Sequence, residues 1–192
     1  QVSLVGSMGA SATEQPSAAR AADVSVAPYC TRILDPKDEN GYMKPVCWNN
    51  EPAVDEYVRG IVDRQAKLRE QGVFVYSLGD EGVTMGCCVH PACIETYRRW
   101  LQEQYGTIEA LNRSWGSNYT SFAEVDLLDR NDNMEAASRT SNPPRWYDRQ
   151  AFARWNLSHF VSRFVADFAE LDPHALTGYE GTGGFGDDYD AI

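Results

Sequence analysis

Residues 73–93 read Val-Phe-Val-Tyr-Ser-Leu-Gly-Asp-Glu-Gly-Val-Thr-Met-Gly-Cys-Cys-Val-His-Pro-Ala-Cys, and no other stretch of the 192-residue chain concentrates so much chemistry. Val73 to Leu78 is a short apolar run, rich in β-branched and aromatic residues and bounded by glycines, which predicts a strand buried on both faces. Asp80 and Glu81 follow it almost directly. A buried strand that ends in acids places carboxylates at the rim of a sheet, where a ligand can reach them and burial can tune their pKa for proton transfer.

A second group of reactive side chains ends the same stretch: Cys87, Cys88, His90 and Cys93 lie within seven residues. The five cysteines of the chain form an odd set, and crowding beside a histidine suits metal ligation better than a disulfide framework. Free thiols in turn favour a reducing compartment such as the cytoplasm. The alternative is a set of buried thiols with an incidental surface histidine.

The composition excludes two classes of partner. A net charge of -11 leaves no basic face for tracking nucleic-acid phosphates. No apolar run approaches the ~20 residues that span a bilayer, and the N-terminal residues lack the pattern of a signal peptide. Both ends of the sequence look cut, so we expect a segment of a longer protein, and an assembly of identical copies stays open.

Apolar runs alternate with helical periodicity along the chain, and this predicts parallel strands joined by covering helices. We expect strands near residues 2–6, 24–29, 73–79 and 176–180, and helices over 10–22, from 49 or 50 to 71, 94–105, 107–115 and 149–171. Residues 116–146 are polar, include two prolines and are predicted to be irregular. The inward side of the last helix is expected to carry Phe152, Trp155, Val161, Phe164, Val165 and Phe168, and Trp100 and Trp155 are expected in the core rather than stacked on a ligand.

Glu180 ends the last predicted strand in a glycine-rich context, as Asp80 and Glu81 end the third. Acids at the carboxyl ends of different parallel strands are typical of a (β/α)-barrel active site. A whole barrel takes ~250 residues, and about four strands are visible here. The sequence therefore predicts that residues 1–192 form one segment of a partial (β/α)8 TIM barrel with parallel strands and covering helices.

The motifs between the third strand and Gly116 resemble glycoside hydrolase family 42, the TIM-barrel β-galactosidases. The resemblance rests on Gly-Asp-Glu-Gly at 79–82, the Cys/His cluster, Tyr-Arg-Arg-Trp-Leu at 97–101, Tyr-Gly-Thr-Ile-Glu-Ala-Leu-Asn at 105–112 and Trp-Gly at 115–116. The combination is specific over about residues 45–125, and the flanks match only in the order of strands and helices.

The resemblance implies that Glu81 is the general acid/base at the end of the fourth barrel strand. In a retaining glycosidase a second carboxylate ~5–5.5 Å away attacks the sugar; in this family it is a glutamate on the seventh strand, which lies outside this chain. Asp80 stands where the family usually has Asn, and an ionised Asp cannot donate a hydrogen bond and raises the pKa of its neighbour. Asp80 and Glu180 are therefore assigned to substrate binding, with Glu180 a pocket or structural acid rather than the nucleophile.

The resemblance also implies a structural zinc. Cys88, His90 and Cys93 match the clustered ligands of the family, with histidine in place of one cysteine, and Cys47 resembles its distant fourth ligand. A Cys₃His set satisfies tetrahedral zinc, and Cys87 is a substitute ligand to consider.

Two function classes follow. The first is a glycosidase segment that acts on a carbohydrate partner, a terminal β-galactoside or a related β-glycoside. The second is a non-catalytic carbohydrate-binding or zinc-stabilised interaction module. A glutamate at a strand end downstream of residue 192 in the full-length protein would favour the first.

Overall fold

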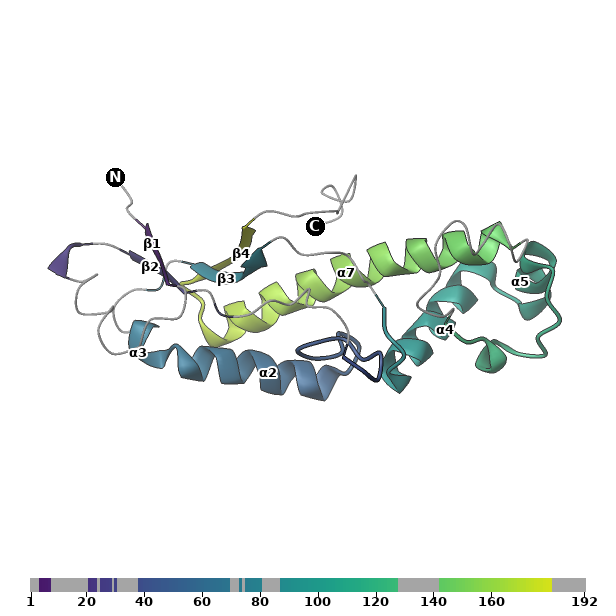
Figure 1. Cartoon of the computed structure of the whole chain (residues 1–192), viewed down its shortest axis with the longest axis horizontal. Helices are drawn as coiled ribbons and strands as arrows, with labels where there is room; N and C mark the ends of the chain where they lie inside the picture. The colour runs from purple at the N-terminus through teal and green to yellow at the C-terminus, as the bar shows by residue number, and fades with distance from the viewer. Residues whose placement is uncertain are drawn as a thin grey trace.

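The computed structural model of the chain describes residues 4–7, 21–23, 25–28, 30, 38–69, 73, 75–80, 87–127 and 142–180. The longest described element, α7 (Pro143–Leu171), spans much of the long axis of the molecule. The strands and α2 (Glu51–Arg64) lie along its C-terminal half, whereas α4 (Pro91–Tyr105) and α5 (Ile108–Trp115) pack near its N-terminal half (Figure 1). The predicted helix over 10–22 lies almost entirely outside the described residues, apart from the turn at 21–22.

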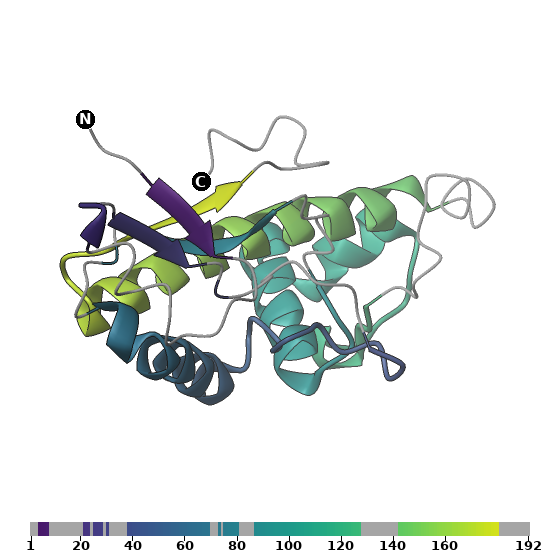
Figure 2. The same cartoon turned by 60° about the vertical axis from the view of Figure 1, so that its left-hand side comes forward.

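The four described strands pair in parallel, as predicted. Strands β1 (Leu4–Ser7) and β2 (Ser25–Pro28) form one pair, and β3 (Val75–Asp80) and β4 (Leu176–Glu180) form the other. The backbone N–H of Cys30 donates to the carbonyl of Ser77 at 3.0 Å and ties the end of β2 to β3. Both pairs gather at the same end of the molecule (Figure 2). The described strands make two separate two-stranded sheets, so the described residues do not form a closed barrel.

Helix α7 begins six residues before its predicted start, so the prediction of irregular structure is wrong for residues 143–146. The Asn142 side chain accepts a hydrogen bond from the Arg145 N–H at 3.2 Å and caps the helix. Pro143 and Pro144 occupy its first turn, where a missing N–H costs no hydrogen bond. The helix ends at Leu171, before Asp172 and Pro173, as predicted.

The buried face of α7 forms an aromatic ladder against the other elements. Trp48 stacks on Phe160 with ring centroids 4.8 Å apart, Tyr76 of β3 contacts Phe168, and Tyr97 of α4 contacts Phe152. Burial of Phe152, Val161, Phe164 and Phe168 confirms most of the predicted inward face, and Trp100 is in the core.

Two residues assigned to that face are exposed instead. Trp155 is 37% exposed and Val165 is 41% exposed. The described partners of α7 pack on the stripe that carries Phe152, Phe160, Phe164 and Phe168, and Trp155 and Val165 lie beyond its edge. The prediction that they belong to the core was wrong, because the part of the chain that the structure describes leaves these two positions of the 29-residue helix exposed.

The shorter helices follow local signals. Helix α2 ends at Arg64 rather than near Gly72, and a single turn, α3 (Ala66–Arg69), continues the segment. Gly106 ends α4 with a positive φ of 72°, and the Thr107 hydroxyl caps α5 by accepting from the Ala110 N–H at 3.3 Å, both as predicted. A short 3₁₀ turn, η1 (Phe122–Glu124), follows α5 and contacts α4.

In the part of the chain that the structure describes, no helix has the length and apolar character needed to cross a membrane.

Candidate functional site

The predicted catalytic region lies at the carboxyl edge of the β3–β4 pair. The register pairs Val75 with Leu176 at the start of the strands and, after an irregularity, Asp80 with Glu180 at their ends. Neighbouring strands lie ~4.8 Å apart. The two acids assigned to substrate binding are thus backbone neighbours at one edge of the sheet. Their side chains and the whole of Glu81 lie outside the described residues.

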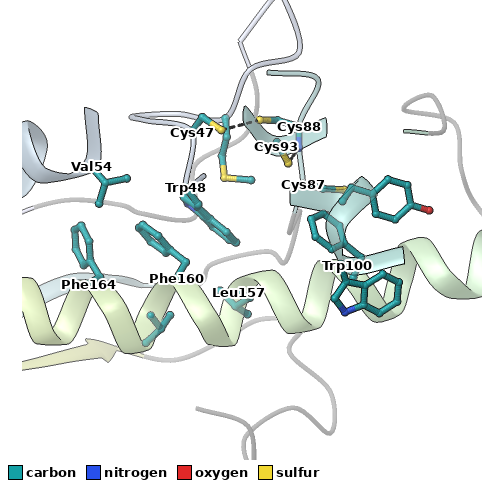
Figure 3. Close-up of a cluster of buried hydrophobic side chains, with 14 of the residues drawn as sticks. Cys47, Trp48, Val54, Cys87, Cys88, Cys93, Trp100, Leu157, Phe160 and Phe164 are labelled. Carbon is teal, nitrogen blue, oxygen red and sulfur yellow. Dashed lines mark hydrogen bonds between the residues drawn. The ribbon is translucent and has the colours of Figure 1, made fainter. Parts of the chain in front are cut away.

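The cysteine cluster is the second predicted site, and the structure brings three of its members together. Cys47 comes from the loop before α2, Cys88 from the segment before α4, and Cys93 from the first turn of α4. The sulfurs of Cys47 and Cys88 lie 3.5 Å apart, and the Cys88 N–H donates to the sulfur of Cys93 at 3.2 Å (Figure 3). All three side chains are buried.

Mutual hydrogen bonding shifts the pKa values of these three thiols in different directions. Hydrogen bonding to Cys47, and then to Cys93, lowers the pKa of Cys88 to about 2. The same interaction with Cys88 raises the pKa of Cys47 to about 11, and the pKa of Cys93 is also raised, first by its contact with Cys47. Of the three thiols, Cys88 is thus the one whose pKa is lowered by its neighbours, and thiolate is the form of cysteine that binds metals.

The three side chains are of a donor type that zinc binds. Tetrahedral Zn–S bonds of ~2.3 Å place two sulfurs about 3.8 Å apart, close to the 3.5 Å between Cys47 and Cys88. The sulfurs are nevertheless packed as hydrogen-bonded thiols. Within the described ranges, no three His, Cys, Asp or Glu side chains are arranged as ready ligands of one ion.

His90, the predicted fourth ligand, has a structural role that the sequence did not indicate. Its Nδ1 accepts a hydrogen bond from the Ala92 N–H at 3.2 Å and caps α4, and its ring packs edge-on against Tyr42 at 5.2 Å. These contacts engage Nδ1 of the ring. Cys87 is buried on the side of Trp100 rather than beside Cys47 (Figure 3).

Two carboxylates that connect separate helices and strands were not predicted from the sequence. Asp148 of α7 accepts hydrogen bonds from the Tyr105 hydroxyl at 2.6 Å and the Trp115 indole N–H at 2.7 Å, which fixes α4 and α5 to α7. Asp172 accepts from the Tyr76 hydroxyl at 2.8 Å and from Nε of Arg69 at 2.9 Å. The partners are separated by 33 to 103 positions in the sequence, so no local pattern could have identified them.

Parallel strands, covering helices and acids at a shared carboxyl edge define an α/β protein with the architecture used by many glycoside hydrolases. The β-galactosidase of Marinomonas ef1 superposes with a TM-score of 0.59 over 88% of this chain and 29% of its own, at 20% identity, which shows a shared fold. A β-galactosidase from Halorubrum lacusprofundi gives a TM-score of 0.54 over 81% of this chain and 26% of its own, at 19% identity.

The chain belongs to glycoside hydrolase family 42, the β-galactosidase family, whose model matches residues 35–189. This confirms the resemblance seen in the sequence. A Thermus sp. β-galactosidase, BgaA, is 36% identical over 97 residues, which are 45% of this chain and 15% of the relative. A Thermus thermophilus β-galactosidase is 53% identical over 45 residues, 21% of this chain and 7% of the relative. The match thus spans a small part of each relative.

Proposed function

We propose that this chain is the acid/base-bearing part of a retaining glycosidase that hydrolyses terminal β-galactosides or related β-glycosides. The observation that carries the proposal is the parallel pairing of β3 with β4, with Asp80 opposite Glu180. Glu81 is the next residue after Asp80 in the sequence. In a (β/α) barrel, catalytic residues come from the carboxyl ends of several strands. We accordingly interpret the described strands as part of such a barrel.

The proposed roles follow from carboxylate chemistry. Glu81, protonated, would give its proton to the leaving glycosidic oxygen and then, ionised, take a proton from the attacking water. Asp80 and Glu180 would accept hydrogen bonds from sugar hydroxyls. The attacking carboxylate would come from outside this chain.

A zinc ion would serve structure rather than chemistry. We propose Cys47, Cys88 and Cys93 as three of its ligands, with His90 as the fourth. A closed site of this kind joins the loop before α2 to the start of α4 and contributes folding energy.

The test of catalysis uses a longer parent protein that contains this chain. Glu81→Gln should slow β-galactosides with poor leaving groups by roughly 10² or more and activated aryl galactosides much less, because only poor leaving groups need protonation. Glu109→Gln is the matched control, since Glu109 is an exposed glutamate on α5. The isolated 192-residue chain should hydrolyse neither substrate.

The pattern across both substrates decides between the two function classes. Equal rates for the Glu81→Gln and Glu109→Gln proteins on both substrates would make Glu81 a bystander. The non-catalytic carbohydrate-binding or interaction module would then be the better description.

A further inference from the structure

A cavity of about 240 Å³ lies in the helical layer, where the start of α2, the middle of α4 and the middle of α7 meet. Its lining includes the aromatic residues Trp48, Trp100, Trp155 and His159 and the polar residues Asn49 and Arg99. None of the lining residues belongs to β3 or β4. The cavity is therefore separate from the strand edge that carries the proposed catalytic acids.

The aromatic part of the wall is held in place by stacking. Trp48 stacks on Phe160 with an interplanar angle of 6°, and Trp155 stacks on His159 with centroids 5.0 Å apart and an interplanar angle of 7°. Trp155 remains 37% exposed although it is one of the largest side chains on α7. Trp155 also stacks on Phe152, with ring centroids 5.9 Å apart. Phe152 and His159 lie three residues before and four residues after Trp155 on the helix, so they flank its ring and leave the indole edge exposed. An apolar edge held in place at an opening can contact the C–H groups of a pyranose ring.

The polar side chains of the cavity wall include hydrogen-bond donors. Asn49 carries a buried side-chain Nδ2 for which the described residues provide no acceptor. A buried donor of this kind is normally satisfied by a partner. Arg99, which donates to the Thr96 hydroxyl at 3.2 Å, lies with Arg163 on the same lining.

The charges on the lining cancel. Arg99 and Arg163 supply two positive charges, and Glu51 and Glu103 supply two negative ones. A site for a phosphate or a metal ion would be dominated by one sign. A balanced set of donors and acceptors between aromatic walls instead suits a neutral ligand with several hydroxyl groups.

We propose that this cavity binds one pyranose ring of a neutral saccharide, as a second carbohydrate site on the outer face of the domain. Its size, 240 Å³, equals the liquid volume of about eight waters, enough for a single ring and too little for several. Asn49 donates to a ring hydroxyl, and the exposed edge of Trp155 contacts the C–H groups of the sugar. The partly open position makes binding weak, with a Kd on the order of 1 mM.

The test measures binding of methyl β-galactoside to the 192-residue chain by saturation-transfer NMR, with sorbitol as a polyol that lacks the ring. Trp155→Ala and Asn49→Leu should each raise the Kd roughly tenfold. Trp155→Phe should largely restore binding. Val165→Ala is the matched control, because Val165 is an exposed apolar residue of the same helix outside the lining.

Glu81→Gln separates this site from the strand edge and should leave the cavity's binding unchanged. If Glu81→Gln abolishes binding while Asn49→Leu and Trp155→Ala do not, all the sugar binds at the strand edge and the cavity proposal is wrong. Equal binding of sorbitol, or no binding up to about 100 mM sugar, would mean that the cavity holds only water. Hydrolysis by the parent protein is measured separately, so either proposal can fail without the other.

Discussion

The buried carboxylate of Asp172 links three elements through single side chains. It accepts from the Tyr76 hydroxyl of β3 at 2.8 Å and from Arg69 of α3 at 2.9 Å, and it immediately follows α7. Tyr76 is fully buried, and desolvation together with Asp172 raises the pKa of its hydroxyl. The folded protein therefore keeps this hydroxyl protonated at pH values where an exposed tyrosine ionises.

Removing the hydroxyl with Tyr76→Phe should lower the free energy of unfolding by about 1–2 kcal/mol at pH 7. The variant loses the hydrogen bond that the Tyr76 hydroxyl donates to the Asp172 carboxylate. The unfolded chain releases the tyrosine proton near pH 10. The stabilisation is thus complete below about pH 10 and declines as the pH rises above it. Urea denaturation at pH 7 and at higher pH should show a shallower decline for Tyr76→Phe than for the natural protein.

The control for this residue is the surface ion pair between Arg145 and Asp126. Its atoms lie 2.8 Å apart, yet the Asp126 side chain is 73% exposed. Asp126→Ala should change stability by less than about 1 kcal/mol. A Tyr76→Phe protein as stable as the natural one would mean that Asp172 finds a replacement partner.

Cysteine proximity could be predicted from the sequence only in part. Cys88 and Cys93 are close in the chain, but the contact of Cys47 with Cys88 bridges 41 positions and was expected only through the family resemblance. His90 was assigned as a ligand through the family resemblance, which places it on one of the clustered cysteines. Its role as a helix cap has no strong sequence signal, because Ser, Thr, Asp and Asn are the usual caps. The cavity wall could not be predicted at all, because it combines three separate helical segments.

At the level of elements, parallel strands were predictable because each is a short apolar run between helical patterns. The start of α7 was not, because Pro143 and Pro144 were interpreted as breaking helix rather than beginning it. Proline disrupts a helix interior but is favourable in the first turn. The exposure of Trp155 and Val165 depends on which elements lie beside α7, and helical periodicity carries no such information.

The N-terminus of α7 gives a direct test of capping. Asn142→Ala removes the acceptor for the Arg145 N–H and should destabilise the protein by about 1 kcal/mol. Asn50→Ala is the matched control, because Asn50 occupies the same position at α2 without a side-chain cap hydrogen bond. Thermal unfolding should separate the two variants, and equal losses would show that the Asn142 cap contributes nothing beyond its backbone conformation.

For the whole molecule, the three sulfurs add to the backbone hydrogen bond from the Val89 N–H to the Gly41 carbonyl in joining two segments that are far apart in the sequence. Cys47 precedes α2, whereas Cys88 and Cys93 belong to the start of α4. A metal bound there would stabilise only the folded arrangement, so its binding free energy would add to the stability of the fold.

We predict one zinc ion per chain when the protein is prepared under reducing conditions without chelators. Cys88→Ser should lose the zinc and unfold at a lower temperature, because one thiolate ligand is removed. Chelator should lower the melting temperature of the natural protein but leave that of Cys88→Ser unchanged.

His90→Asn keeps a residue that caps helices well while removing the imidazole, so it should weaken zinc binding without fraying α4. Cys87→Ala, at a buried cysteine outside the proposed ligand set, should retain the full zinc content. Elemental analysis measures the zinc of each variant, and metal-free natural protein with an unchanged melting temperature in chelator would leave the cluster as buried thiols alone.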